Sequence, residues 1–154
     1  GIILSGEGIA IDAVISDFTA GAAAILSPNI AAEDFYVIEG QGSLYHPSFA
    51  GVSLGLLHGS QPDYLVICHD PFREKMRHSD YDMPSIHDTI NLNMMHASLT
   101  NKNVSVKGII LNLSQARDQS EREKIKNEFE DLYNLPVADI FNFKVDKIVD
   151  NILS

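Results

Sequence analysis

Five short apolar runs alternate along the chain with longer segments in which apolar residues recur at helical spacing. Their aromatic and β-branched residues are typical of buried strands. Strands that alternate with helices predict a parallel sheet covered by helices on both faces. We therefore predict an α/β fold, a single domain built on a three-layer, open and mostly parallel sheet. The predicted strands are Gly1–Leu4, Phe35–Ile38, Tyr64–Cys68, Lys107–Leu111 and Val137–Ile140.

The segments between and after these runs predict five helices. The first is rich in alanine and apolar almost all round, which predicts burial against the sheet or against another subunit. Gly59 suits the C-terminus of the second. Ser85-x-x-Asp88 and Ser120-x-x-Glu123 resemble capping boxes that open the third and fourth. The predicted helices are Asp12–Leu26, Ser48–His58, Ser85–Leu99, a segment beginning at Ser120, and Val145–Leu153.

The stretch DFYVIEGQGSLYH, residues 34–46, holds the first candidate site. Its predicted strand ends at Glu39, and ligands of open α/β sheets bind at the carboxyl ends of strands. The helix that follows would add free N–H groups suited to an anion. His46, at the entrance to that helix, could bind the ligand or cap the helix, and the whole stretch could also be an ordinary strand-to-loop turn. The candidate ligand-binding backbone amides are those of Gly40, Gln41, Gly42 and Ser43.

Two further strands are expected to deliver polar residues to the same edge. The strand that begins at Tyr64 runs into His69, and the strand that begins at Lys107 runs into Asn112. The loop Phe72–Pro84 could be a solvated surface turn, the usual case for a charged loop, but its length without a regular pattern also favours a binding loop or lid. Cations in such a loop can bind a carboxylate or a phosphate, and an Arg side chain can do so with two parallel hydrogen bonds. The loop holds the first cations of the chain, Arg73, Lys75 and Arg77, together with His78.

Charge is unevenly spread along the 154 residues. The first 72 contain eight acids and no Lys or Arg, whereas residues 73–154 contain all eleven bases and thirteen acids. With a net charge of −10 and no basic face, the chain is a poor partner for nucleic acid or for an anionic membrane. An anion bound by the first half would rely on backbone amides, a metal, or cations from elsewhere.

Cysteine usage and hydropathy predict a soluble cytoplasmic protein. The single cysteine, Cys68, lies within an apolar run and has no partner for a disulfide, which fits a reducing compartment. The sequence contains no apolar stretch of membrane-spanning length and no basic segment before a signal-like one.

Three runs of the sequence together resemble one known family. They are GEGIAIDAVISDFTAGAA, YVIEGQGSLYHPSFAGVSLGLLHGSQPDYLVICHDP and VKGIILN. The second run contains EGQGS, HP and HGSQPD in order, which is far more specific than a lone glycine motif. Over essentially its whole length, the chain resembles the C-terminal domain of the D-glutamate N-acetyltransferase family, long catalogued as a domain of unknown function.

The resemblance implies a P-loop NTPase-like fold, similar to that of dethiobiotin synthetase, preceded by an N-terminal Rossmann-like domain. In dethiobiotin synthetase a strand-end V-E-G-x-G places a glutamate near magnesium and phosphates, which Glu39 matches, and a strand-end asparagine near the adenine is matched by Asn112. The family's G-x-x-x-x-G-K-[ST]-like loop is absent from these 154 residues. It is expected upstream of Gly1, so we expect the chain to be a fragment that works with the missing N-terminal part.

The resemblance also implies a reaction, the transfer of acetyl from acetyl-CoA to the amine of D-glutamate. A base must first take a proton from the substrate ammonium, and Glu39 and His69 are the candidates. Glu39 could instead hold the ammonium electrostatically. Arg73 and Arg77 would clamp the substrate carboxylates or the CoA phosphates. The amides of residues 40–43 would face the thioester oxygen or a phosphate.

Two other functions stay open on the sequence. An ATP- and magnesium-dependent enzyme of ligase or kinase type would use Glu39 as a metal-site residue. A non-catalytic ligand-binding or assembly domain would use the helix Asp12–Leu26 chiefly as an interface. We expect a small-molecule substrate and a homo-oligomer in either enzyme, and the sequence itself assigns no metal ligands.

Overall fold

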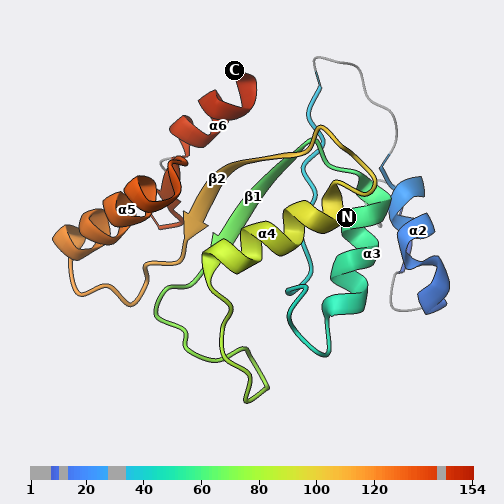
Figure 1. Ribbon diagram of the computed structural model, residues 1–154, viewed down its shortest axis with the longest axis horizontal. Coiled ribbons are helices and arrows are strands. Elements are labelled where there is room, and N and C mark those ends of the chain that lie inside the picture. The colour runs from blue at the N-terminus through green and yellow to red at the C-terminus, as the bar shows by residue number, and fades with distance from the viewer. Residues whose placement is uncertain (1–7, 11–13, 28–33, 142–144) are drawn as a thin grey trace. The chain divides into compact units, whose positions relative to one another are not determined.

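The computed structural model describes residues 8–10, 14–27, 34–141 and 145–154 (Figure 1). The chain divides into two compact units. Unit 1 is Gly1–Pro62 with Leu92–Asn103, and unit 2 is Asp63–Asn91 with Val104–Ser154. No helix within the described ranges is long and apolar enough to cross a membrane.

Unit 2 is built on a parallel sheet of three strands in the order β1-β2-β3. The strands are β1 (Tyr64–His69), β2 (Ser105–Leu111) and β3 (Val137–Asp139). Three of the predicted strands are therefore confirmed, each with a bound that differs by one or two residues. The α/β class with an open parallel sheet is confirmed as well.

The core of unit 2 lies around the carboxyl half of β2. Ile109, Leu111 and Leu113 are fully buried there and pack with Ile67 of β1 and Val137 of β3. Three helices belong to this unit in whole or in part: α4 (Ile86–Ala97) as far as Asn91, α5 (Gln119–Tyr133) and α6 (Asp146–Leu153).

Each helix of unit 2 adds apolar side chains to the sheet. Ile86 and Ile90 of α4 and Phe129 of α5 pack against the core cluster. Ile148 of α6 covers Gly108 so closely that a Cβ added at Gly108 would lie 2.7 Å from its Cγ1. A residue with a side chain at position 108 would therefore push α6 away from β2.

Of the two capping boxes predicted in unit 2, one is confirmed and one is wrong. Ser85 caps α4 as predicted, because its Oγ accepts the Asp88 N–H at 3.0 Å. The prediction for α5 was wrong, since its cap is Asp118, whose carboxylate accepts the Glu121 N–H at 2.9 Å. The sequence contains two overlapping capping patterns here, Asp118-x-x-Glu121 and Ser120-x-x-Glu123. The helix begins at the first, because the full negative charge of the aspartate is favourable at a helix N-terminus.

Phe35–Ile38 is not a strand, which corrects the sequence prediction. All four residues are exposed, Val37 to 91%, and the Tyr36 hydroxyl donates a hydrogen bond to the Leu26 carbonyl at 2.6 Å. A strand requires a neighbour to complete its hydrogen bonds, and none of the described strands pairs with this segment. The other predicted strand, Gly1–Leu4, lies outside the described residues.

Unit 1 contains two packed helices, α2 (Thr19–Ile25) and α3 (Ala50–Ser60), which lie side by side in Figure 1. The predicted helix Asp12–Leu26 is thus shorter than expected, with a 3₁₀ turn at Ser16–Phe18 before it. Its predicted burial is only partly right, because Thr19, Ala22 and Ala23 are buried while Phe18 and Ile25 are exposed.

Gly59 does not end α3, contrary to the prediction. The helix ends at Ser60, and its C-terminal cap is Gln61, which takes the left-handed conformation with φ 47°. Gly59 lies inside the helix, where an added Cβ would clash with the Ala20 carbonyl oxygen and lie 2.6 Å from the Ala23 Cβ. The glycine is required for the close approach of α2 and α3 rather than for its backbone freedom.

A pair of glycine substitutions in α3 tests this packing. Gly59→Ala should destabilise the protein by about 2 kcal/mol, because the backbone of α2 must move away. Gly51 is exposed and an added Cβ there meets nothing within 4 Å. Gly51→Ala should therefore stabilise the same helix by about 0.5–1 kcal/mol. Urea unfolding of the two variants measures both effects, and equal effects of the same sign would contradict the packing of Gly59 on α2.

Candidate functional site

The residues predicted for the site fall into two groups, one in each unit. Unit 2 brings together His69, Arg73 and Asn112, with Arg77 in the loop that follows. Unit 1 holds Glu39, Gly40, Gln41, Gly42, Ser43 and His46.

The carboxyl ends of β1 and β2 form one edge in unit 2. The Asn112 N–H donates to the His69 carbonyl at 2.8 Å, and the Ile140 N–H donates to the Leu111 carbonyl at 3.0 Å. These hydrogen bonds extend the parallel pairing by one residue beyond the ends of β2 and β3. His69, Asn112 and the end of β3 therefore lie together at the edge where open α/β sheets bind their ligands.

The His69 imidazole is half-buried at this edge beside the aromatic ring of Phe129, with ring centroids 6.2 Å apart. Burial is the largest influence on its pKa and lowers it below the ordinary value of 6.5. The negative charge of Asp70 raises the pKa, and the positive charge of Arg73 lowers it. The imidazole is therefore neutral at pH 7 and able to accept a proton.

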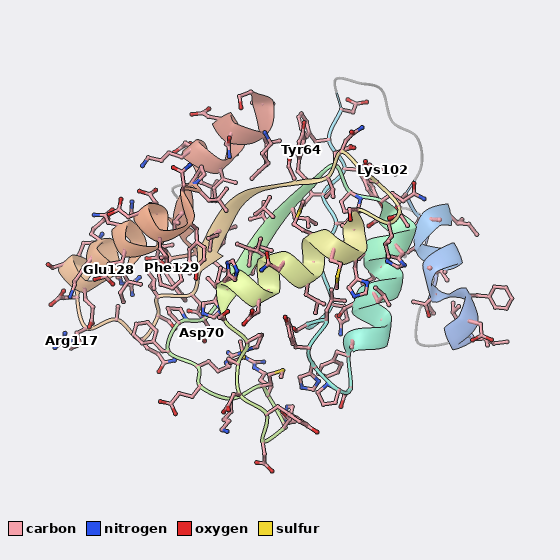
Figure 2. All side chains as sticks on the ribbon, viewed as in Figure 1. Tyr64, Asp70, Lys102, Arg117, Glu128 and Phe129 are labelled. Atoms are coloured by element: carbon pink, nitrogen blue, oxygen red, sulfur yellow. The ribbon has the colours of Figure 1, made fainter. Side chains whose placement is uncertain are left out.

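Asp70 and Arg73 are the ends of a tight turn directly after β1. The Arg73 N–H donates to the Asp70 carbonyl at 3.2 Å, and the Phe72 N–H donates to the Asp70 carboxylate at 3.2 Å. Asp at the first and Pro at the second position of such a turn are both favoured, because the carboxylate accepts a backbone N–H and the proline presets φ. Figure 2 shows Asp70 at the opposite end of β1 from Tyr64.

The same carboxylate holds the Arg73 side chain. Its second oxygen accepts a hydrogen bond from Arg73 Nη2 at 3.1 Å. Asp70 is buried, whereas 32% of the Arg73 side chain is exposed. Within the described residues the guanidinium hydrogen-bonds only to Asp70, so its other N–H groups can still donate to a bound carboxylate.

A second buried aspartate lies at the end of β3. Asp139, 3% exposed, accepts a hydrogen bond from Arg122 Nη1 of α5 at 2.9 Å and one from the Phe141 N–H at 3.0 Å. Sequence reasoning missed both Asp139 and Asp70 as site residues. The available signal was an aspartate at the carboxyl end of a predicted strand, because Asp70 comes directly after β1 and Asp139 is the last residue of β3.

The loop Phe72–Pro84 is more regular than predicted. Its middle forms a short antiparallel hairpin, with the Met76 N–H donating to the Tyr81 carbonyl and the Met83 N–H to the Glu74 carbonyl. Lys75 forms an ion pair with Asp82 across this hairpin. Arg73 and Lys75 each form an ion pair with an aspartate, and Arg77 is exposed on the hairpin. The three cations of the loop therefore do not form a single anion-binding cluster.

In unit 1 the glycine loop runs through turns into α3. The Ser43 Oγ accepts the Tyr45 N–H at 3.1 Å, and the Ser53 hydroxyl of α3 donates to the Gln41 carbonyl. Gly42 has φ 62°, and a Cβ there would lie 2.7 Å from that of Phe49, so only glycine fits. Glu39 and Gly40 are exposed, and an added Cβ at Gly40 meets nothing within 4 Å.

His46 is buried and supports the turn that leads into α3. Its Nδ1 accepts the Ser48 N–H at 3.1 Å, and its ring lies against Phe49 with centroids 4.4 Å apart. His46 does not cap α3 as one of its two predicted roles required, because the N-cap of α3 is Phe49 and no side chain caps it. The other role, ligand binding, stays a prediction.

Comparison with known proteins places the chain in a family. The model described as "Domain of unknown function (DUF1611_C) P-loop domain" matches residues 1–149. The chain belongs to this family. A crystal structure of a DUF1611 family protein from Anabaena variabilis superimposes with a TM-score of 0.84 and 31% identity, covering 99% of this chain and 45% of that chain. The likeness to a P-loop fold that the sequence suggested is thereby confirmed.

Two curated relatives carry the name of an activity. A "D-glutamate N-acetyltransferase" from a Pseudoalteromonas species is 50% identical over 155 residues, 99% of this chain and 46% of that protein. One of the same name from Tritonibacter scottomollicae is 38% identical over 151 residues, 97% of this chain and 45% of that protein. The chain spans less than half the length of both relatives.

Proposed function

We propose that this domain forms part of a D-glutamate N-acetyltransferase that uses acetyl-CoA as the acetyl donor. The observation that carries the proposal is the 50% identity, over 99% of the chain, to a relative with that name. The edge of the unit 2 sheet adds chemical support. A neutral imidazole and a partly exposed guanidinium lie there within a few residues of each other, and the reaction needs a base and a carboxylate-binding group.

The substrate must lose one proton before the C–N bond forms and the C–S bond breaks. The ammonium of D-glutamate loses a proton to a base, which frees the nitrogen lone pair. The amine then attacks the thioester carbonyl carbon, a C–N bond forms, and the C–S bond breaks. CoA departs as a thiolate that takes up a proton, and the products are N-acetyl-D-glutamate and CoA.

In this proposal His69 is the base and Arg73 binds a substrate carboxylate. Of the two candidate bases, His69 is the half-buried one and its lowered pKa keeps it neutral, whereas Glu39 is exposed. Asn112 and Arg77, which belong to the same unit as His69, would contact the bound molecules. The roles predicted for Glu39 and for the amides of residues 40–43, in unit 1, stay predictions.

A product assay by mass spectrometry on the full-length protein tests the proposal. Acetyl-CoA and D-glutamate are supplied in four reactions, with neither ATP nor magnesium, with each alone, and with both. We expect N-acetylglutamate to form at the same rate in all four.

Product that appears only with ATP and magnesium would replace the proposal with an ATP-dependent enzyme. Consumption of ATP without acetylation would do the same. L-Glutamate serves as the matched control acceptor, and equal turnover of the two enantiomers would contradict the assignment of D-glutamate as the substrate.

A further inference from the structure

Asp70 orients Arg73, and the two carboxylate oxygens of Asp70 accept hydrogen bonds from different groups. One oxygen accepts the Phe72 N–H and closes the turn after β1, while the other accepts Arg73 Nη2 at 3.1 Å. The carboxylate is buried, so its position is fixed by the fold. The guanidinium, by contrast, is one-third exposed and would sample many rotamers without an anchor.

We propose that Asp70 is a positioning residue that holds the Arg73 guanidinium beside His69, so that a substrate carboxylate bound by Arg73 brings its amine to the imidazole. The inference rests on the proposed function and adds to it the residue that orders the site. In an amino acid the α-carboxylate and the amine share one carbon atom. A fixed guanidinium therefore also fixes where the amine can lie.

The charges around His69 give the arrangement a signature that a purely structural aspartate would lack. The charged groups that act on the imidazole are Asp70 and Arg73, while α5 faces it with the uncharged ring of Phe129. Loss of the Asp70 charge should lower the pKa of His69, and loss of the Arg73 charge should raise it. Two neighbouring substitutions thus move one pKa in opposite directions.

Asp70→Asn is the informative variant, because the amide oxygen can still accept the Phe72 N–H and keep the turn. Glu74→Gln removes an equal charge from an exposed side chain in the following hairpin and is the matched control. Binding of D-glutamate to the full-length protein is measured by calorimetry with CoA present, which completes the site without allowing acetyl transfer.

We expect Asp70→Asn to weaken D-glutamate binding about tenfold and Arg73→Ala about 100-fold. Adding Asp70→Asn to Arg73→Ala should cause no further loss, because Asp70 acts through Arg73. Unchanged binding in Asp70→Asn, or losses that simply add in the double variant, would overturn the proposal. So would a loss of the same size in Glu74→Gln.

The pKa of His69, followed by NMR of its imidazole, completes the test. Opposite shifts in Asp70→Asn and Arg73→Ala support the arrangement, and shifts of the same sign or none overturn it. If the wild-type protein binds D-glutamate in this pattern but acetylates nothing, the proposed function fails while the positioning role stands. If acetylation occurs and Asp70→Asn binds normally, only the positioning role fails. A wild-type protein that binds no D-glutamate overturns both.

Discussion

Replacing His69 with Gln should reduce kcat/KM for D-glutamate by about 10²- to 10⁴-fold, the usual contribution of a general base. Glutamine keeps a polar group of similar size beside Phe129 but cannot take up the ammonium proton. In the wild-type protein, kcat/KM should be full at pH 7 and fall as the pH drops through the pKa of His69. Because burial lowers that pKa, the fall should lie below the ordinary histidine value of 6.5.

His87→Gln is the matched control for His69. It makes the same substitution at an exposed position in the first turn of α4, within the same unit. Steady-state kinetics on both variants should show a loss in the first alone. A His69→Gln enzyme with wild-type kcat/KM would show that another group is the base, with Glu39 the next candidate.

Replacing Arg122 with Ala should destabilise the protein by about 3 kcal/mol, because it leaves the Asp139 carboxylate buried without its cation. Asp139 is 3% exposed, and it also accepts the Phe141 N–H that fixes the chain after β3. The loss should appear as a lower urea midpoint for unfolding. Asp139→Asn in the Arg122→Ala background should recover part of the loss, because the double variant leaves no buried charge at this contact.

Arg117→Ala provides the comparison for Arg122. The Arg117–Glu121 pair at the start of α5 also joins a guanidinium and a carboxylate at 2.9 Å, yet the Arg117 side chain is 84% exposed. Solvent screening leaves such an exposed pair with little effect on stability. If the two arginine variants unfolded at the same urea concentration, the Arg122–Asp139 pair would not be the buried contact described here.

The strands of unit 2 could be predicted closely because each contains a short run rich in apolar and β-branched residues. Tyr64–His69 is recognisable from its own sequence, although Ile67 is its only buried residue. Phe35–Ile38 has the same local pattern but is exposed and unpaired among the described residues. Whether a run becomes a strand depends on a partner elsewhere in the chain, and the run itself carries no information about that partner.

Contacts between helices or between side chains of different segments could not be predicted from the sequence either. Gly59 fits the rule for a helix C-terminus, yet its role is set by Ala20 and Ala23 of another helix. In the site, His69 and Asn112 could be predicted because parallel strands deliver their ends to one edge. The engagement of Arg73 by Asp70 could not, because a charged side chain in a loop looks the same in sequence whether it is paired or solvated.

The most direct test of the central claim, that the edge at β1 receives D-glutamate, is an NMR titration of the full-length protein in the presence of CoA. His69→Gln assigns the imidazole signal by its disappearance. We predict a saturable change of the His69 signal as D-glutamate is added. If His69 stays unchanged while the same protein sample acetylates D-glutamate, the substrate binds elsewhere and the site described here is wrong.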